Sequence, residues 1–370
     1  MKVVLIANYA ADRQESMLRY ASLLRDGLAM AGHEVTLTAP RQTFRQAGPQ
    51  GLPKWIGYID KYLLSPRELE RAARGADVVH VCDHANSVYV PAKSTIPYVA
   101  TCHDLLAVRG ALGEDTDSPA SFMGVHLQRA IVAGLHRAHA VACVSQATLK
   151  DVQRLLNGYS GKLAVVPNAV NYPYRRLDVE TVQSRLEAVE ALRTSEPYVL
   201  HVGSNLRRKN RGCVLRAFAA AKNWDGLLVI AGSPLDDELR DLATRLGVLN
   251  RIVEVERPDN ETLEALYNGA LAMLFPSHFE GFGWPLIEAQ ACGCPVICSD
   301  REPMPEVTGN AAILCDADDA PAFARAIVEL AENDSRRTQL VAEGLQNAAR
   351  YDTATMTRRF VELYEQIAGA

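Results

Sequence analysis

The 370-residue sequence contains no apolar run long enough to cross a membrane. It has no C-x₂-C pair and no regular cysteine spacing, so neither a structural zinc module nor a disulfide framework is indicated. A G-x-G-x-x-G turn and a G-x-x-x-x-G-K-[ST] loop are also missing, which disfavours dinucleotide oxidoreductases and nucleoside triphosphatases. What is present is 48% hydrophobic and 22% charged residues, an ordinary composition for a globular enzyme of two domains.

The eight cysteines lie mostly in apolar segments, so we interpret them as reduced thiols that pack as small core residues. Six residues of types that bind metals could together form a zinc site: His80, Cys82, Asp83, His84, Cys102 and His103. Because this group lacks the ligand spacing of zinc modules, we predict that the chain binds no metal there. The short apolar start, Val3 to Ala7, is interpreted as a first strand and not as a signal peptide.

Charge is distributed unevenly along the chain. Residues 1–170 carry 18 Lys and Arg against 14 Asp and Glu, a formal +4, which leaves −9 for the remainder of a chain whose total is −5. This mild excess suits an anionic or membrane-surface partner better than nucleic acid, which is not expected to bind.

The segment 41–64 interleaves cations with apolar and aromatic side chains: Arg41, Phe44, Arg45, Lys54, Trp55, Ile56, Tyr58, Lys61 and Tyr62. Such a segment could rest on anionic lipid. A solvated loop and helix whose aromatic rings pack on their own domain is the favoured interpretation. We therefore expect a cytoplasmic protein, with 41–64 as the candidate for peripheral contact with the inner membrane face.

Short apolar runs rich in β-branched residues alternate with helical patterns along the chain. The first series comprises Lys2–Asn8, Glu34–Ala39, Val78–Cys82, Tyr98–Cys102, Ala140–Ser145 and Leu163–Pro167. After a polar stretch from Asn171 to Glu196, the second comprises Tyr198–Gly203, Leu227–Gly232, Ile252–Val255, Ala272–Pro276, Pro295–Ser299 and Ala311–Cys315. This alternation predicts an α/β fold with two doubly wound parallel-sheet domains, 1–170 and 171–351. Ligands of such folds bind beyond the carboxyl ends of the strands.

The stretch Phe279–Glu288 places two carboxylates, Glu280 and Glu288, eight residues apart across a glycine-rich turn. The glycines let the backbone approach a ligand, and Pro285 suits the first position of a helix. Since the N-terminus of a helix attracts anions, the two glutamates flank a helix end that favours phosphate.

A second polar turn, His201–Asn210, runs from a predicted strand into three consecutive cations. Arg208 can bind a diphosphate through two parallel hydrogen bonds, and Lys209 can neutralise it as a point charge. A solvated basic turn is the alternative. His201 itself is interpreted as a core residue within its strand.

Together these residues resemble the retaining GT-B glycosyltransferases of family 4. The resemblance rests on Pro276–Gly283 with Glu288, Arg208–Asn210, Val166–Val170 and Cys102–Leu105, and it spans nearly the full chain. It implies two Rossmann-like domains facing a central cleft, the second of which holds a nucleotide-sugar donor. It also implies that segment 352–370 crosses back to the first domain, and that no metal or other cofactor is needed.

Carried over by position, the resemblance gives roles to individual residues. Arg208 and Lys209 would neutralise the donor diphosphate, and Glu288 would hold the ribose hydroxyls. Glu280 would lie beside the transferred sugar, with His103 reaching that sugar from the other domain. The remaining residues expected to contact the donor, some through backbone amides, are Gly203, Ser204, Phe282, Gly283 and Trp284.

Several of these residues have a purely structural alternative. His103 could be a packed strand-end histidine, although the adjoining Asp104 favours function. Ser145 and Asn168 are expected to shape turns at the cleft, or in the case of Ser145 to cap a helix. Cys292–Pro295 occupies the place of a glycine turn in the family, so its thiols are read as packing groups.

The predicted activity is transfer of a hexose, with mannose preferred, from a GDP- or UDP-linked donor to a saccharide or lipid-linked acceptor of a surface polymer. With Glu288 engaged by ribose, Glu280 has no carboxylate partner, which favours same-face transfer over double displacement. Asn8–Asp12 replaces the paired glycines of many members, so the acceptor is left open. A nucleotide-sugar-binding partner without activity and a GT-B epimerase are the alternatives.

Overall fold

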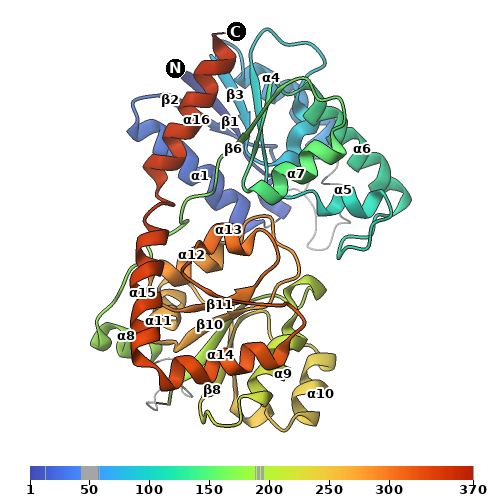
Figure 1. Cartoon of the computed structure of the whole chain (residues 1–370). Coiled ribbons are helices and arrows are strands. Elements are labelled where there is room, and N and C mark those ends of the chain that lie inside the picture. Colours follow the sequence, from blue (N-terminus) through green and yellow to red (C-terminus); the bar gives the residue numbers. More distant parts are fainter. Residues whose placement is uncertain are drawn as a thin grey trace. The chain divides into compact units, whose positions relative to one another are not determined.

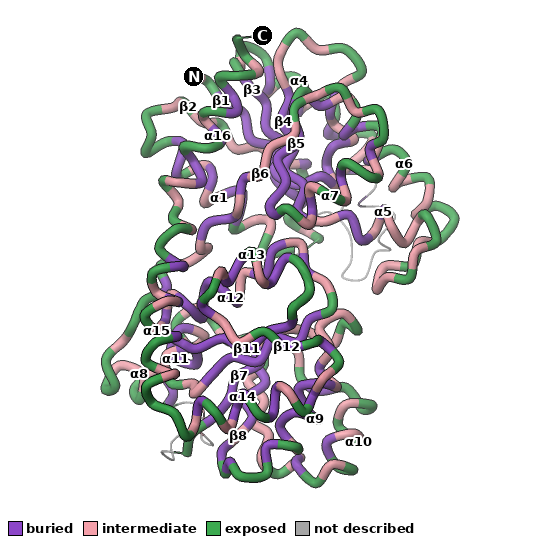
Figure 2. The backbone as a smooth tube through the Cα atoms, viewed as in Figure 1, coloured by how far each residue is buried: buried purple, intermediate pink, exposed green. Residues whose placement is uncertain are grey.

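The computed structural model describes residues 1–12, 14–42, 57, 59–187, 189, 192 and 196–369. Contacts between Cα atoms divide the chain into two compact units, which are treated separately (Figure 1). Unit 1 comprises Met1–Asn171 and Thr353–Ala370, and unit 2 comprises Tyr172–Asp352. Each unit is built on one six-stranded parallel sheet whose central strands are largely buried (Figure 2).

Unit 1 contains a sheet of strand order β2-β1-β3-β4-β5-β6. Its strands are β1 (Lys2–Ile6), β2 (Glu34–Thr38), β3 (Val78–Val81), β4 (Tyr98–Cys102), β5 (Ala140–Cys143) and β6 (Lys162–Val165). All neighbouring strands are parallel. The order reverses between β1 and β3, the switch point at which doubly wound sheets bind ligands beyond the carboxyl ends of their strands.

The described helices of unit 1 lie between these strands in sequence, except α16, which follows unit 2. They are α1 (Glu15–Met30), α4 (Ser65–Ala72), α5 (Leu106–Ala111), α6 (Phe122–Arg137), α7 (Gln146–Leu155) and α16 (Thr353–Ala368), with short turns η1 (Ala10–Asp12), η2 (Ile59–Leu64) and η3 (His84–Tyr89). Ser145 caps α7, because its side-chain oxygen accepts a hydrogen bond of 3.1 Å from the backbone N–H of Thr148. The structural alternative for Ser145 is therefore the one observed.

The last helix, α16, packs against α1 within unit 1 (Figure 1). Gly27 allows this close approach, since a Cβ atom at that position would collide with the side chain of Thr357. At the buried end of the contact, Tyr364 Oη shares a 2.5 Å hydrogen bond with His80 Nδ1. His80 Nε2 shares another, of 2.7 Å, with Thr101 Oγ1, and burial lowers the pKa of His80 to about 3. A neutral, fully bonded histidine therefore joins α16 to the sheet.

Unit 2 contains a sheet of strand order β12-β11-β10-β7-β8-β9. Its strands are β7 (Tyr198–Gly203), β8 (Leu227–Gly232), β9 (Ile252–Glu256), β10 (Ala272–Phe275), β11 (Val296–Ser299) and β12 (Ile313–Cys315). If β7 to β12 are numbered 1 to 6 and the sheet is followed from β9 to β12, the strand order is the 3-2-1-4-5-6 of the Rossmann fold. The predicted α/β class with two Rossmann-like parallel sheets is confirmed.

The helices of unit 2 complete its layers. They are α8 (Val179–Leu186), α9 (Arg211–Ala220), α10 (Asp237–Arg245), α11 (Asn260–Gly269), α12 (Trp284–Ala291), α13 (Met304–Thr308), α14 (Ala320–Glu332) and α15 (Asp334–Ala348), with short turns η5 (Arg207–Lys209) and η6 (Leu249–Arg251). Helices α9 and α14 pack on each other and contribute Phe218 and Phe323 to the core.

Several sequence interpretations concern residues outside the sites. All eight cysteines are free and buried, as expected of core thiols. No described helix has both the length and the apolar character needed to span a membrane, and no three described His, Cys, Asp or Glu side chains are grouped to hold a metal. Of the segment 41–64, residues 43–56 and 58 lie outside the described residues. Within its described part, Lys61 Nζ pairs with Asp12 Oδ2 at 2.7 Å.

Candidate functional site

The two polar motifs of unit 2 meet where its strand order reverses. Strands β7 and β10 are parallel neighbours, and the chain continues from β7 into η5 and from β10 into the turn that contains Glu280. Carboxyl ends of parallel strands share one sheet edge, so residues 71 positions apart in sequence become neighbours. This edge is the candidate site of unit 2.

Glu280 joins both cations of the basic turn. Lys209 Nζ lies 2.6 Å from Glu280 Oε1, and Arg208 Nη1 lies 2.8 Å from Oε2. Arg208 Nη1 also donates to the carbonyl oxygen of Phe279 at 3.2 Å, and Lys209 Nζ lies 5.1 Å from the ring centre of Phe275. Glu280 is only 6% exposed, so a fixed anion is clamped between two fixed cations.

Burial is the largest influence on the pKa of Glu280 and raises it. The charges of Lys209 and then Arg208 act in the opposite direction, and the net pKa lies below the ordinary carboxyl value of 4.5. A carboxyl whose pKa is depressed by folding stabilises the folded chain at pH values above the unfolded pKa. That contribution is lost as pH falls below about 4.5 and through the folded pKa, so it is fully present at neutral pH.

Asn210 holds the basic turn in place. It has a left-handed backbone conformation, with φ 52°, and its side-chain oxygen caps α9 by accepting from the N–H of Cys213. Its Nδ2 donates to the carbonyl oxygen of Ala317 at 2.7 Å and to that of Pro276 at 3.2 Å. One side chain thus ties the end of η5 to the loops that follow β10 and β12.

We expect Asn210→Ala to lower the free energy of unfolding by about 2 kcal/mol or more, from left-handed strain and lost hydrogen bonds together. Asn210→Gly should cost about 1 kcal/mol, because glycine adopts the conformation without strain. Urea denaturation of both variants measures the difference. Equal losses would show that the backbone conformation contributes nothing.

The glycine-rich turn leads into α12. Gly283 has φ 96° and forms the N-cap, so the helix begins at Trp284. Pro285 is therefore the second helical residue and not the first, because the left-handed glycine has already turned the chain. The ring of Phe282 lies edge-on to Trp284 and to Tyr351, with centres 6.3 and 5.7 Å apart. This packing fixes the turn at the positive end of the α12 dipole.

Glu288 lies on α12, about one helical turn after Trp284. It is buried, and its Oε2 accepts a 2.9 Å hydrogen bond from the hydroxyl of Tyr267 on α11. Gly203 and Ser204 are also predicted to contact the donor. Gly203 ends β7 and Ser204 follows it, and a Cβ atom at Gly203 would lie within 4 Å of the Lys209 side chain. His201 is fully buried and its Nδ1 donates to the carbonyl oxygen of Leu274, in agreement with its interpretation as a core residue.

His103 lies in unit 1, just after β4. Its Nε2 donates to the carbonyl oxygen of Cys82 at 3.0 Å, and the ring of Tyr20 stands edge-on with centres 4.7 Å apart. Burial, the largest influence, lowers the pKa of His103, so the ring is neutral at pH 7. The carboxylate of Asp104 accepts from the backbone N–H of Leu106, the first residue of α5, at 3.0 Å.

A polar network at the switch point of unit 1 went unnoticed in the sequence. Asn8 Nδ2 donates to Asp83 Oδ2 at 2.5 Å, and Asn86 donates to Asn8 Oδ1 at 3.1 Å. These residues follow β1 and β3, so the atypical Asn8–Asp12 segment begins with a buried, bonded asparagine. Only the order of strands in space could have revealed this network.

Comparison with known proteins identifies the families of both units. Residues 17–172 match the family described as Glycosyltransferase Family 4, and residues 182–347 match Glycosyl transferases group 1. The O-antigen chain mannosyltransferase B of Escherichia coli is 28% identical over 65% of this chain and 64% of its own length. The D-inositol 3-phosphate glycosyltransferase of Corynebacterium glutamicum is 29% identical over 73% and 66%. The chain thus covers less than two thirds of either relative.

A longer match is the phosphatidyl-myo-inositol mannosyltransferase of Mycolicibacterium smegmatis, 26% identical over 100% of this chain and 95% of its own. Among solved structures, sucrose-phosphate synthase from Thermosynechococcus elongatus has a TM-score of 0.76 at 22% identity, over 100% of this chain and 99% of that one. HepE of Anabaena, in complex with UDP and glucose, has a TM-score of 0.72 at 17% identity, over 99% and 100%. These structures show the GT-B fold, and the family matches confirm the resemblance stated from sequence. The chain belongs to the group 1, family 4 glycosyltransferases of GT-B fold.

Proposed function

We propose that this enzyme transfers a hexose, with retention of configuration, from a nucleoside-diphosphate sugar to a saccharide or lipid-linked acceptor during synthesis of a cell-surface polysaccharide. The observation that carries the proposal is the clamp of Arg208 and Lys209 on Glu280 at the switch point of unit 2. Two mannosyltransferases among the relatives favour mannose. Structural relatives bound to UDP and to ADP leave the nucleotide base open, with GDP or UDP preferred here.

The cations of unit 2 would act on the leaving group. Cleavage of the sugar–phosphate bond places negative charge on the departing diphosphate, and groups fixed beforehand stabilise that charge without reorganising. Arg208 and Lys209 are held in this way by Glu280 and Phe279. The N-terminus of α12 adds the positive end of a helix dipole. These groups supply the charge that a metal ion supplies elsewhere, which supports a reaction without a metal.

The remaining residues would hold the sugar and the ribose. Glu280 and the backbone amides of Phe282 and Gly283 are proposed to bind hydroxyls of the transferred sugar, beside Gly203, Ser204 and Trp284. Glu288 is proposed to bind the ribose hydroxyls. In unit 1, the neutral His103 offers a hydrogen bond and no charge, which suits a sugar hydroxyl.

The state of Glu280 supports a same-face transfer. A carboxylate held by two cations, with a pKa below its usual value, is a weak nucleophile. Glu288 bonds to Tyr267 on another helix. We therefore propose that the leaving phosphate, and not a second carboxylate, accepts the proton of the acceptor hydroxyl. Unit 2 would be the donor unit and unit 1 the acceptor unit.

A thermal-shift panel of UDP, GDP, ADP and their common sugar conjugates, without added metal, tests the proposal. A ligand that binds only the folded chain raises its melting temperature by mass action. We expect one base to give a selective shift and its sugar conjugate to support transfer. No shift with any of them would overturn the proposal, binding without turnover would indicate a sugar-nucleotide-binding partner, and an isomerised donor would indicate an epimerase.

A further inference from the structure

The carboxylate of Glu288 is oriented by a residue from a different helix. Tyr267 lies on α11, and its hydroxyl donates to Glu288 Oε2 across 2.9 Å. Tyr267 is fully buried, with 0% of its surface exposed. Burial first, and then the nearby charge of Glu288, raise the pKa of Tyr267 well above its ordinary value. The phenol therefore remains protonated, and the direction of this hydrogen bond is fixed.

The ring of Tyr267 is itself held from a second side. Tyr174 stands edge-on against it, with ring centres 5.8 Å apart and planes at 89°. The chain following Tyr174 is fastened to α11 through side chains of that helix. Glu264 Oε1 accepts from the backbone N–H of Arg175 at 2.9 Å, and Asn268 Oδ1 accepts from that of Leu177 at 2.8 Å.

Tyr267 is thus held by its hydrogen bond to Glu288 and by the ring of Tyr174. They hold a phenol hydroxyl against one oxygen of a carboxylate that the proposed function assigns to ribose. A carboxylate that is fixed in this way keeps its two oxygens at set positions, so that two neighbouring hydroxyls can bond to it together. A carboxylate free to rotate would bind the same hydroxyls at a cost in rotamer entropy.

We propose that Tyr267 is a positioning residue for Glu288 and so makes unit 2 selective for ribonucleotide donors over 2′-deoxyribonucleotide donors. This inference rests on the proposed role of Glu288. Tyr267 touches neither the sugar nor the diphosphate, and it acts through the carboxylate that it orients. Loss of the Tyr267 hydroxyl should therefore weaken binding of the ribose hydroxyls. Binding of the diphosphate by Arg208 and Lys209 should not change.

The test compares dissociation constants of GDP, UDP and ADP with those of their 2′-deoxy counterparts, for the base that binds the wild-type chain. The wild-type chain should prefer the ribonucleotide by about tenfold or more. In Tyr267→Phe the affinity for the ribonucleotide should fall about fivefold, and that for the 2′-deoxynucleotide should change less than twofold. Selectivity should thus drop by several fold.

Tyr198→Phe is the matched control. Tyr198 is also buried, and its hydroxyl donates to the carbonyl oxygen of Leu266 on the same helix at 2.8 Å. Its hydroxyl bonds the backbone of α11 and not the carboxylate of Glu288, so its variant should retain the wild-type selectivity. Should Tyr267→Phe not fold, Tyr174→Leu removes the ring that holds Tyr267 edge-on and should lower the selectivity in the same direction.

Each outcome bears on the inference. Equal losses of affinity for both nucleotides in Tyr267→Phe would show a structural role only and overturn it, as would unchanged selectivity. A wild-type chain that binds a nucleoside diphosphate without preferring the ribose form would overturn the inference while leaving the proposed function standing. A wild-type chain that binds none would overturn both.

Discussion

Lys209→Ala is expected to lower kcat/KM for the donor by about 10²- to 10³-fold, the usual cost of one group that stabilises transition-state charge. The Lys209 side chain is 12% exposed, and its ammonium is held between Glu280 and the ring of Phe275. Because it is fixed before the donor binds, its charge meets the developing diphosphate without reorganisation. Steady-state kinetics with the donor identified by thermal shift measures the loss.

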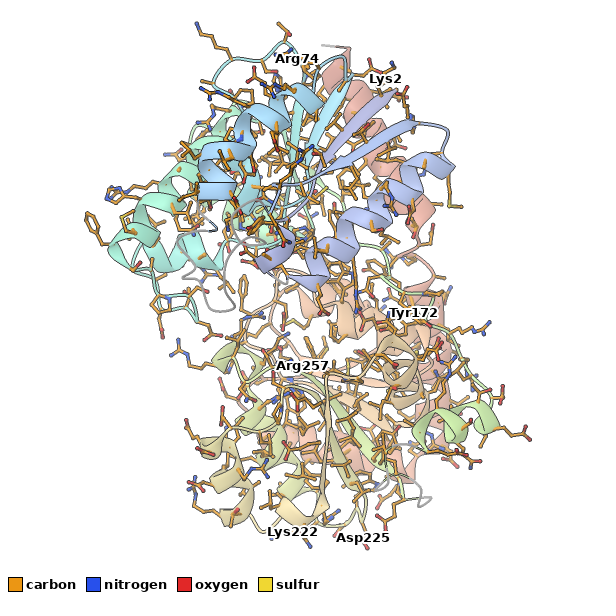
Figure 3. The ribbon with its side chains drawn as sticks, turned by 180° about the vertical axis from the view of Figure 1, so that it is seen from behind. Lys2, Arg74, Tyr172, Lys222, Asp225 and Arg257 are labelled. Atoms are coloured by element: carbon orange, nitrogen blue, oxygen red, sulfur yellow. The ribbon has the colours of Figure 1, made fainter. Side chains whose placement is uncertain are left out.

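Lys222→Ala is the control for removal of a positive charge. Lys222 is exposed at the surface of unit 2, after α9 (Figure 3). Its variant should keep the wild-type kcat/KM. Lys209→Arg, which keeps the charge but changes the shape of the donor group, should recover part of the activity. If Lys209→Ala kept its fold and turned over within threefold of wild type, the assignment of the diphosphate site would be wrong.

Glu280→Gln is expected to separate binding from transfer. Turnover should fall by about 10²-fold or more, because the charge beside the sugar is lost. The ligand-free variant should melt at a lower temperature, since two clustered cations lose their buried counter-ion. A nucleoside diphosphate would then supply that missing negative charge. It should therefore raise the melting temperature of Glu280→Gln by more than that of the wild-type chain.

Paired thermal-shift and activity measurements examine both effects of Glu280→Gln at once. Glu256→Gln serves as control, because Glu256 is exposed at the end of β9 and pairs loosely, at 3.9 Å, with Arg257. A nucleotide shift no larger than that of wild type would mean that Glu280 and the diphosphate do not compete for the same cations. Full activity would mean that Glu280 does not act on the sugar.

Local sequence patterns predicted the strands well. Each of the twelve predicted runs overlaps one observed strand, and the ends differ by at most two residues, because short apolar β-branched runs favour strands. Repetition of the pattern also predicted two Rossmann-like sheets. The start of α12 was misplaced by one residue, since Gly283 takes the cap position that a proline pattern alone does not reveal.

Relations between distant segments were beyond those patterns. The Arg208–Glu280 pair depends on β7 lying beside β10, and Asn8 meets Asp83 only because β1 lies beside β3. In the sequence, Tyr267 occupies an ordinary apolar position of a helix. Its hydrogen bond to Glu288 depends on the packing of α11 on α12. Residue type and spacing therefore named the charged groups of the site but not the neutral side chains that hold them.

The attachment of α16 to unit 1 bears on how the chain folds during its synthesis. The sheet of unit 1 leaves the ribosome early, but the helix that packs on α1 at Gly27 and bonds His80 leaves it only after unit 2. Unit 2 is continuous in sequence and can complete its core in the interval, since domains fold as units during translation. Until α16 has emerged, nascent unit 1 lacks the helix that packs on α1 and bonds His80.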